Sequence, residues 1–431
     1  MLCAIAIIAG CGGLLLCHTL DIQLHHASRL ILVPGAVIIA TFLLDRIGPK
    51  RDHVLIACAL GLSAIGLLTL WRLELGAPAS DTTGLRTAGT RQMVWMLVGT
   101  VALVATYGLI RDIRRLANYK YLCGAAAIGL IVATTLRGHE VNGAKLWIGI
   151  ENLILFQPTE LAKVLFCIFL AGYIAAKGDM LTATGPRFLG ISVPEMRYLA
   201  PLLLVAIFSL AVFVLQRDLG AAVLIYGVFL ALLYLATGRR TYGALGAGIF
   251  IAGGVAADRM FPHVHRRIEA WLNPWATVND SGWQIAQSLF CFAEGGVFGR
   301  GLGNGLPVPG QLPAAHTDLI LAVIGEELGM AGVIAIMLLS AFISYRGFSI
   351  AWQARDRFGG LLAAALSTAF ALQTLVIVGG VTKLVPLTGI TLPFVSYGGT
   401  SVLMSFISLG LLLCISRDCI HRASDESEGQ E

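Results

Sequence analysis

Long apolar runs are the feature that most constrains this chain, because about 17 to 25 consecutive apolar residues are enough to cross a bilayer as a helix. Such runs recur along the 431 residues, at 2–18, 29–46, 53–71, 92–110, 121–136, 158–176, 198–216, 219–237, 241–257, 319–344, 359–380 and 398–416. Only 13% of the residues are charged, compared with about 25% in an ordinary soluble domain. The sequence therefore predicts an all-α polytopic membrane protein with about twelve transmembrane helices.

The rest of the composition narrows the class of protein further. The 50 glycines suit helices that pack closely in lipid, where small residues favour association. Most of the nine cysteines lie inside apolar runs, and no Cys and His cluster accompanies Cys291 or Cys419, so we expect neither metal binding by cysteine nor a disulfide framework. Basic inner loops explain the net charge of +5 without any nucleic acid. The sequence has no P-loop, H-E-x-x-H or G-x-S-x-G motif, which argues against ATP-driven, metalloprotease and serine-hydrolase chemistry.

Basic residues indicate which loops face the cytoplasm. If the N-terminus is inside, the inner segments and the C-terminal tail hold 17 of the 30 Lys and Arg residues, as the positive-inside rule requires. We therefore expect both termini to be cytoplasmic. No basic region precedes the first run and no cleavage site follows it, so we expect a membrane helix there and not a signal peptide.

The segment 258–318 is unlike every other connection in the chain. It is rich in Gly and Pro and carries Trp271, Trp275 and Trp283, and tryptophan favours the membrane interface. Its stretch WQIAQSLFCFAEGGVFG is amphipathic and predicts an interfacial or re-entrant helix. Connections of this length are usually functional or disordered, and this one is too apolar for disorder. We expect the chemistry to be built from the helical bundle and this extracellular loop.

Ionisable residues inside membrane spans are costly unless they pair or face water, so each is a candidate functional residue. Glu160 and Lys163 are three positions apart, and they either form a structural ion pair or contact a substrate. Arg217 and Asp218 interrupt two apolar runs, where they form either the polar tip of a hairpin or a substrate contact. Trp147, in a polar connection, either anchors the chain at the interface or stacks on lipid or sugar.

A histidine and three acids follow the long loop in the stretch LPAAHTDLILAVIGEELG. Asp318 or Thr317 can cap the helix that begins there. Asp318 can instead act as a general base or hold a divalent cation beside a pyrophosphate, roles that suit group transfer from a lipid-linked donor. Glu326 lies about 12 Å beyond Asp318 along a regular helix, where we expect it to pair with other polar groups inside the protein. Glu327 lies on a different side of that helix from Asp318.

Several stretches occur in a fixed order across about residues 53–416: NGAKLWI, FQPTELAK, QRDLGAAVL, WQIAQSLFCFAEGGVFGRGLG, PAAHTDLILAVIGEELG and GVTKLVPLTGITLPFVSYGGTS. Together they resemble the SEDS family, the shape, elongation, division and sporulation proteins. The resemblance implies a membrane core of ten helices over residues 53–416, which contains the extracellular loop 258–318. Residues 1–52 then hold two additional N-terminal helices, and residues 417–431 form a polar cytoplasmic tail.

The resemblance implies an inverting glycosyltransferase that polymerises lipid II into glycan strands at the outer face of the bacterial cytoplasmic membrane. The essential aspartate of the family's H-T-D motif corresponds to Asp318, which would take the proton of the attacking sugar hydroxyl while undecaprenyl pyrophosphate leaves. A divalent cation, Mg or Mn, near Asp318 is the cofactor to expect, and no organic cofactor is implied. The candidate substrate-binding residues are Trp147, Lys163, Arg217, Arg267, His316, Thr317, Lys383 and Ser396. Structural or ion-pair roles are expected for Glu160, Lys163, Asp218 and Glu326.

The family also implies a class B penicillin-binding protein, a transpeptidase, as a partner beside lipid II and membrane lipid. RodA, FtsW and SpoVE share these motifs, so elongation, division and sporulation all stay open, although the extra N-terminal spans and the GRGLGNG stretch favour a RodA-like protein. One alternative function is a lipid II flippase, which intramembrane charges and broken helices also suit, although we find no internal repeat. Another is a non-catalytic scaffold for the transpeptidase, in which Asp318 would be dispensable.

Overall fold

The structure is a computed structural model that describes residues 24–48, 52–77, 84–141, 144–150, 154–182, 218–305 and 314–428. It also describes residues 187–188, 191–192, 200–201, 197, 204, 216 and 312. The chain divides into two compact units, and each is described by itself. The first unit comprises residues 1–111, 267–346 and 373–413, and the second comprises residues 112–266, 347–372 and 414–431.

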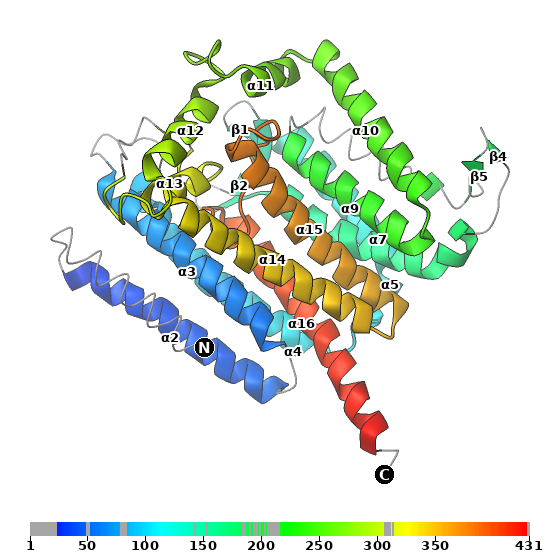
Figure 1. The fold of residues 1–431 in the computed structure, drawn as a ribbon. Coiled ribbons are helices and arrows are strands. Elements are labelled where there is room, and N and C mark those ends of the chain that lie inside the picture. The colour runs from blue at the N-terminus through cyan, green and yellow to red at the C-terminus, as the bar shows by residue number, and fades with distance from the viewer. Residues whose placement is uncertain are drawn as a thin grey trace. The chain divides into compact units, whose positions relative to one another are not determined.

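Long apolar helices dominate the described residues, as the apolar runs predict (Figure 1). Within the described part of the chain, 8 helices are long and apolar enough to cross a membrane. They are α3 (His53–Gly76), α4 (Ala88–Leu109), α6 (Lys120–Arg137), α7 (Pro158–Thr182), α9 (Leu219–Thr237), α14 (Gly329–Gln353), α15 (Arg357–Val381) and α16 (Gly399–Glu428). A ninth is counted if α10 (Arg240–Met260) and α11 (Pro262–Leu272), which meet at a bend of 108°, form one broken span. The predicted class, an all-helical polytopic membrane protein, is confirmed.

In the first unit, α2 (Leu24–Ile47) and α3 both pack on α4, and the short 3-10 helix η1 (Leu85–Thr87) leads into α4. Asp52 caps the N-terminus of α3 by accepting hydrogen bonds from the backbone amides of Val54 and Leu55. The same carboxylate pairs with Arg346 at 2.6 Å. Because Asp52 satisfies two otherwise unpaired amides and a guanidinium, it fixes the start of α3.

The long connection contains two short helices, α11 and α12 (Trp283–Gly295). The stretch predicted to form an interfacial or re-entrant helix is α12, whose 13 residues are too few to span a bilayer. It packs against α13 (Ile320–Glu327) within the first unit. Helix α12 therefore supports the segment that follows the H-T-D motif.

The prediction of one continuous span over residues 319–344 is wrong. The structure breaks it into α13 and α14, because Gly329 adopts a left-handed conformation with φ of 68°. A left-handed glycine ends a helix without the strain that a side chain would add. The amides of Met330 and Ala331 then donate to the carbonyls of Gly296 and Val297, at 2.9 and 3.0 Å.

In the second unit, α6 packs on α7, α7 on α9, and α9 on α10, with the short helix α5 (Arg115–Asn118) contacting α6 and α7. Between α6 and α7 lies an antiparallel sheet of β1 (His139–Val141), β2 (Ala144–Ile150) and β3 (Ile154–Phe156), in the order β1-β2-β3. A second small hairpin pairs β4 (Arg187–Phe188) with β5 (Ile191–Ser192). The sequence predicted the polar connection before α7 but not its strands.

Two predicted spans cannot be compared with helices. Residues 2–18 lie outside the described residues, as does most of 198–216. At the C-terminus, helix α16 continues to Glu428, so most of the polar tail predicted for 417–431 extends the last helix.

Candidate functional site

The H-T-D motif lies in a tight turn that precedes α13. The amides of Thr317 and Leu319 both donate to the carbonyl of Ala314, at 3.0 and 3.2 Å, which closes the turn. Leu319 occupies the N-cap position of α13, and Asp318 stands one residue before it. The capping position therefore belongs to neither Thr317 nor Asp318. The half-buried Asp318 lies where the turn meets the helix.

The segment 389–398 holds this turn in place through two short hydrogen bonds, and a third within the segment fixes Ser396. The Ser396 hydroxyl donates to the carbonyl of Thr317 at 2.7 Å and accepts from the amide of Leu392 at 2.9 Å. The amide of Tyr397 donates to the carbonyl of His316 at 2.8 Å, and the two rings lie 5.5 Å apart. Ser396 is 1% exposed, so its bonds form without competition from water. The structure thus brings together His316, Thr317, Asp318 and Ser396, four of the residues that the sequence singled out.

A glutamine on α4 secures the other side of that segment. The Gln92 amide nitrogen donates to the carbonyl of Ser396 at 3.1 Å, and its oxygen accepts from the amide of Gly398 at 3.4 Å. Gln92 is 1% exposed. Sequence reasoning missed this residue, although a polar amide near the start of an apolar span was the available signal.

Side chains of α11 and α12 hold the preceding segment, residues 381–388. The Arg267 guanidinium donates to the carbonyls of Leu387 and Thr388, at 3.3 and 3.2 Å. The indole of Trp271 donates to the carbonyl of Lys383 at 3.1 Å, and the buried Ser288 hydroxyl donates to that of Val381 at 2.9 Å. The sequence predicted that Arg267 contacts the substrate. In the structure it holds the backbone of the segment 381–388, and its positive charge lies beside that segment.

A glycine faces the Asp318 carboxylate. Gly389 has φ of 77°, and a β-carbon added there would lie 3.5 Å from Oδ2 of Asp318. The carboxylate therefore packs against bare backbone of the 381–398 segment. A left-handed turn of this kind suits glycine because other residues are strained in it.

Backbone strain is concentrated in the same two segments. Among the described residues, those other than glycine with positive φ are Ala314, Lys383 and Phe394, at 54°, 63° and 65°. The first begins the H-T-D turn and the other two flank Gly389. Such conformations persist only where the surroundings enforce them, and they cluster at functional sites.

Glycines allow the segment 295–301 to pack against the C-terminal end of α13 backbone to backbone. The amides of Arg300 and Gly301 donate to the carbonyls of Glu326 and Glu327, both at 3.0 Å. A β-carbon on Gly299 would collide with the carbonyl of Glu327. Collisions with opposing backbone are also found for added β-carbons on Gly295 and Gly329. The EGGVFGRG and GEELG stretches therefore form one tightly packed pair.

The two glutamates of the GEELG stretch are both buried, at 4% and 2% exposure for Glu326 and Glu327. Glu327 pairs with Arg72 of α3 at 2.5 Å. Burial raises the pKa of the Glu327 carboxyl to about 7, while the Arg72 guanidinium acts to lower it. Burial, together with Glu326, raises the pKa of the Cys291 thiol to about 12, so that thiol is not activated.

The other predicted residues lie elsewhere. In the second unit, Lys163 pairs with Glu160 at 2.8 Å, and both side chains are largely buried. Asp218 caps α9 by accepting from the amide of Ala221 at 2.9 Å. Trp147 lies on β2, opposite His139. Arg217 lies outside the described residues.

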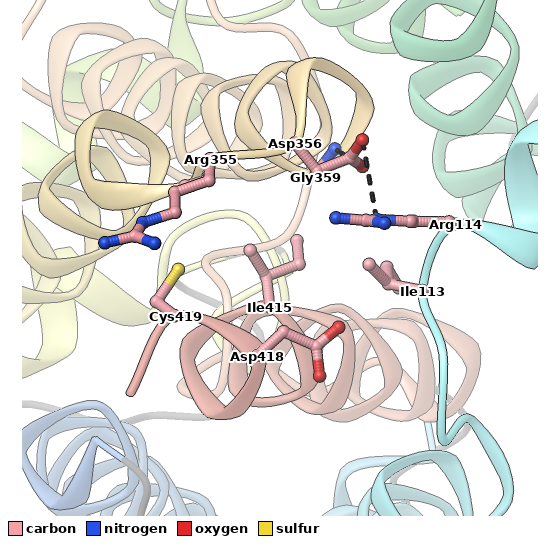
Figure 2. A pocket seen from close by; sticks show the side chains of 9 residues that line it. Ile113, Arg114, Arg355, Asp356, Gly359, Ile415, Asp418 and Cys419 are labelled. Atoms are coloured by element: carbon pink, nitrogen blue, oxygen red, sulfur yellow. Dashed lines mark hydrogen bonds and ion pairs between the residues drawn. The ribbon is translucent and has the colours of Figure 1, made fainter. Parts of the chain in front are cut away.

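A pocket in the second unit involves none of the predicted site residues. Figure 2 shows the Arg114 guanidinium directed towards the carboxylate of Asp356, 3.7 Å from its Nε atom. Asp356 also accepts from the amide of Gly359 at 3.0 Å and so caps α15. Arg355, Ile415 and Asp418 also line the pocket. Arg114 and Asp356 in this pocket pair with each other, so we assign them a structural role.

Metal coordination by protein side chains alone does not fit the described part of the chain. Three or more His, Cys, Asp or Glu side chains are nowhere grouped there in a way that could hold an ion. The H-T-D turn offers one carboxylate. A magnesium-type ion commonly binds through one or two carboxylates together with substrate phosphates, and that donor set fits this site.

The helices define a multi-pass membrane protein. In it, an irregular and strained segment packs against the H-T-D turn and its one half-buried carboxylate. The profile of the cell cycle proteins FtsW, RodA and SpoVE matches residues 52–420. The chain therefore belongs to this family, which confirms the resemblance seen in its motifs.

Known relatives agree with this assignment. The chain is 42% identical over 376 residues to the peptidoglycan glycosyltransferase RodA of Mycobacterium tuberculosis, covering 86% of this chain and 79% of that one. It is 33% identical over 368 residues to the probable peptidoglycan glycosyltransferase FtsW of Escherichia coli O157:H7, covering 84% and 85%. A solved chain of a peptidoglycan synthase complex, 23% identical, superposes with a TM-score of 0.68 over 86% of this chain and 98% of that one. The chain is thus more similar to this RodA than to this FtsW.

Proposed function

We infer that this protein is a peptidoglycan glycosyltransferase that polymerises lipid II, with Asp318 as its catalytic residue. The observation that carries the proposal is the half-buried Asp318 carboxylate on a turn that Ser396 and Tyr397 fix to the segment 389–398. The names of the relatives, at 42% and 33% identity, support the activity. A carboxylate held on a rigid turn is suited to accept one proton at a fixed position.

The reaction needs one base. The 4-hydroxyl of one lipid-linked disaccharide attacks the anomeric carbon of the growing strand's lipid-linked end, and a glycosidic C–O bond forms. The bond from that carbon to the pyrophosphate breaks, and undecaprenyl pyrophosphate leaves with the electron pair. Asp318 accepts the hydroxyl proton or positions the hydroxyl. A single displacement inverts the anomeric centre, and the diphosphate needs no strong acid to leave.

Positive charge near the diphosphate stabilises the leaving group. Arg267 on α11 and Lys383 in the segment 381–388 would contribute this charge, and Lys163 and Arg217 are further candidates from the sequence. A Mg or Mn ion, when bound, would add charge at the diphosphate, with Asp318 as its protein ligand and phosphate oxygens completing its shell. His316 and Thr317 are candidates for contacting lipid II, and Trp147 is a candidate for stacking on sugar or lipid. The buried Ser396 serves by holding the turn in place.

We place the protein in the bacterial cytoplasmic membrane, with both termini cytoplasmic and the H-T-D turn at the outer face. The support is the charge asymmetry of its loops. A class B penicillin-binding protein is the proposed partner, because a similar fold occurs in a peptidoglycan synthase complex. The higher identity to RodA favours a role in elongation.

The test is polymerisation by the purified protein. Wild type and Asp318→Ala are supplied with lipid II and a divalent cation in detergent, and glycan strands are resolved on a gel. We expect polymer from wild type and none from the variant, with equal thermal stability for both. Normal polymerisation by the variant would exclude Asp318 as the catalytic residue.

The two alternatives predict other outcomes. A scaffold gives polymer only when an active partner polymerase is present. A flippase moves labelled lipid II across liposomes without making polymer. Either result would replace the glycosyltransferase assignment.

A further inference from the structure

Arg72 is a charged residue inside an apolar helix, and the proposed reaction does not use it. It lies near the C-terminal end of α3, and its side chain is 3% exposed. We propose that the Arg72–Glu327 pair is a positioning latch, which holds the segment 299–305 against the far end of α13 and thereby sets the placement of Asp318. The proposal rests on Asp318 being the catalytic residue.

The guanidinium contacts two parts of the chain. Its Nε lies 2.5 Å from the Glu327 carboxylate, at the end of α13. Its Nη2 donates to the carbonyls of Gly303 and Gly305, at 3.4 and 3.2 Å. A planar group with several donors can serve a carboxylate and two carbonyls at once, whereas a lysine ammonium is a point charge. Arg72 therefore ties the segment 299–305 to α13 as well as to α3.

Glycine at 305 lets both acids approach this centre. A β-carbon on Gly305 would lie 3.0 Å from Cγ of Glu327 and 3.3 Å from Cδ of Glu326. Electrostatic attraction from both carboxylates acts on Arg72. The latch is thus one buried cluster in which a cation faces two acids and two backbone carbonyls.

Helix α3 supports α13 at its other end too. Leu73, the neighbour of Arg72, packs in a buried cluster with Leu85, Ala315 and Val323. Ala315 belongs to the H-T-D turn, and Val323 lies in the middle of α13. Since α13 has only 8 residues, contacts at Ala315 and at Glu327 fix both of its ends. Releasing Arg72 would leave the far end of α13 to its packing on α12 and to the backbone bonds from Arg300 and Gly301.

Variants of the Arg72–Glu327 pair can separate an effect on the stability of the protein from an effect on the placement of Asp318. Removing one partner of a buried ion pair leaves an uncompensated charge, whereas replacing both partners by apolar residues of similar size is often neutral or stabilising. Arg72→Met/Glu327→Met should therefore be more stable than Arg72→Met alone, although the buried Glu326 stays beside it. It would still lack the bonds to Gly303 and Gly305.

The matched control is the ion pair at the opposite end of the same helix. Asp52 caps the start of α3 and pairs with Arg346. Arg346→Met loosens α3 without touching residues 299–305. Arg72→Lys keeps the charge but loses the fork that bonds two carbonyls, so it provides a graded variant should the double variant fail to fold.

The experiment measures lipid II polymerisation, thermal stability and hydrogen exchange of the 299–305 amides in the full-length purified protein. For Arg72→Met/Glu327→Met we expect a Tm above that of Arg72→Met alone, kcat lowered at least 10-fold, KM within 2-fold, and exchange in 299–305 at least 10-fold faster. Arg72→Lys should fall between this variant and wild type, and Arg346→Met should change neither kcat nor that exchange.

Two results would overturn the latch. One is full activity in the double variant once its stability is restored, and the other is unchanged exchange in 299–305 for both Arg72 variants. The exchange measurement does not require polymerase activity. If wild type makes no polymer, the proposed function fails, while exchange still decides whether Arg72 holds the segment.

Discussion

Ser396→Ala removes the hydroxyl that joins the H-T-D turn to the segment 389–398. Two buried groups lose their partner, namely the carbonyl of Thr317 and the amide of Leu392. Leaving a buried polar group unsatisfied costs about 1–3 kcal/mol, so the free energy of unfolding should fall by about 2–4 kcal/mol if the site relaxes partly. If about 1.4 kcal/mol of this loss falls on the placement of Asp318, kcat decreases about 10-fold.

The matched control for that variant is Ser405→Ala. Ser405 is similarly buried, at 7% exposure, but its hydroxyl donates only to the carbonyl of Ser401 within α16. Because helix backbone already uses that carbonyl, Ser405→Ala should be within about 0.5 kcal/mol of wild type. Thermal unfolding in detergent and initial rates of lipid II polymerisation measure both variants. Equal Tm and kcat for the two variants would refute the role of Ser396 in holding the turn.

Substitutions at three further positions, two of them with a control variant, test the packing around the site and the second unit. Ala314→Gly should raise stability by about 0.5–1 kcal/mol, because a left-handed residue with a side chain is strained, and an unchanged or lower Tm would argue against that strain. Gly299→Ala should cost about 2–4 kcal/mol from strain and collision with Glu327, whereas Gly238→Ala, at a left-handed glycine whose β-carbon meets open space, should cost only the strain of about 1 kcal/mol; comparable losses of Tm would contradict the packing. Asp218→Ala should lower stability by about 1 kcal/mol by removing the cap of α9, while Asp218→Asn should preserve it; loss of activity without loss of stability in Asp218→Asn would favour a substrate contact.

The helices could be predicted because apolar length alone identifies a membrane span. The runs at 53–71, 121–136, 219–237 and 359–380 all fall within described helices, and the run at 92–110 extends one residue past the end of α4. The break after Glu327 could not be predicted, because it depends on backbone bonds from Met330 and Ala331 to a segment about 30 residues earlier. A glycine in an apolar run is compatible with a continuous helix until its partner is known.

The site was predicted in part. Motif resemblance singled out Asp318 and Ser396, but Gln92 and Arg72 contact their partners across more than 200 residues of sequence, and such long-range pairing leaves no local pattern. Arg267 was chosen for its charge, whereas its bonds go to two carbonyls. The sequence shows that a charged residue lies in or beside an apolar segment. Only the fold shows which groups that residue contacts.

The most direct test of the account is the single-turnover rate of glycosidic bond formation by Asp318→Asn relative to wild type, with lipid II saturating. Asparagine preserves the size and shape of the side chain but cannot accept a proton as a carboxylate does. General-base catalysis contributes about 100- to 10,000-fold, so the rate should fall by about that factor while lipid II binding and Tm stay unchanged. A rate within a few-fold of wild type would contradict the assignment of Asp318 as the base.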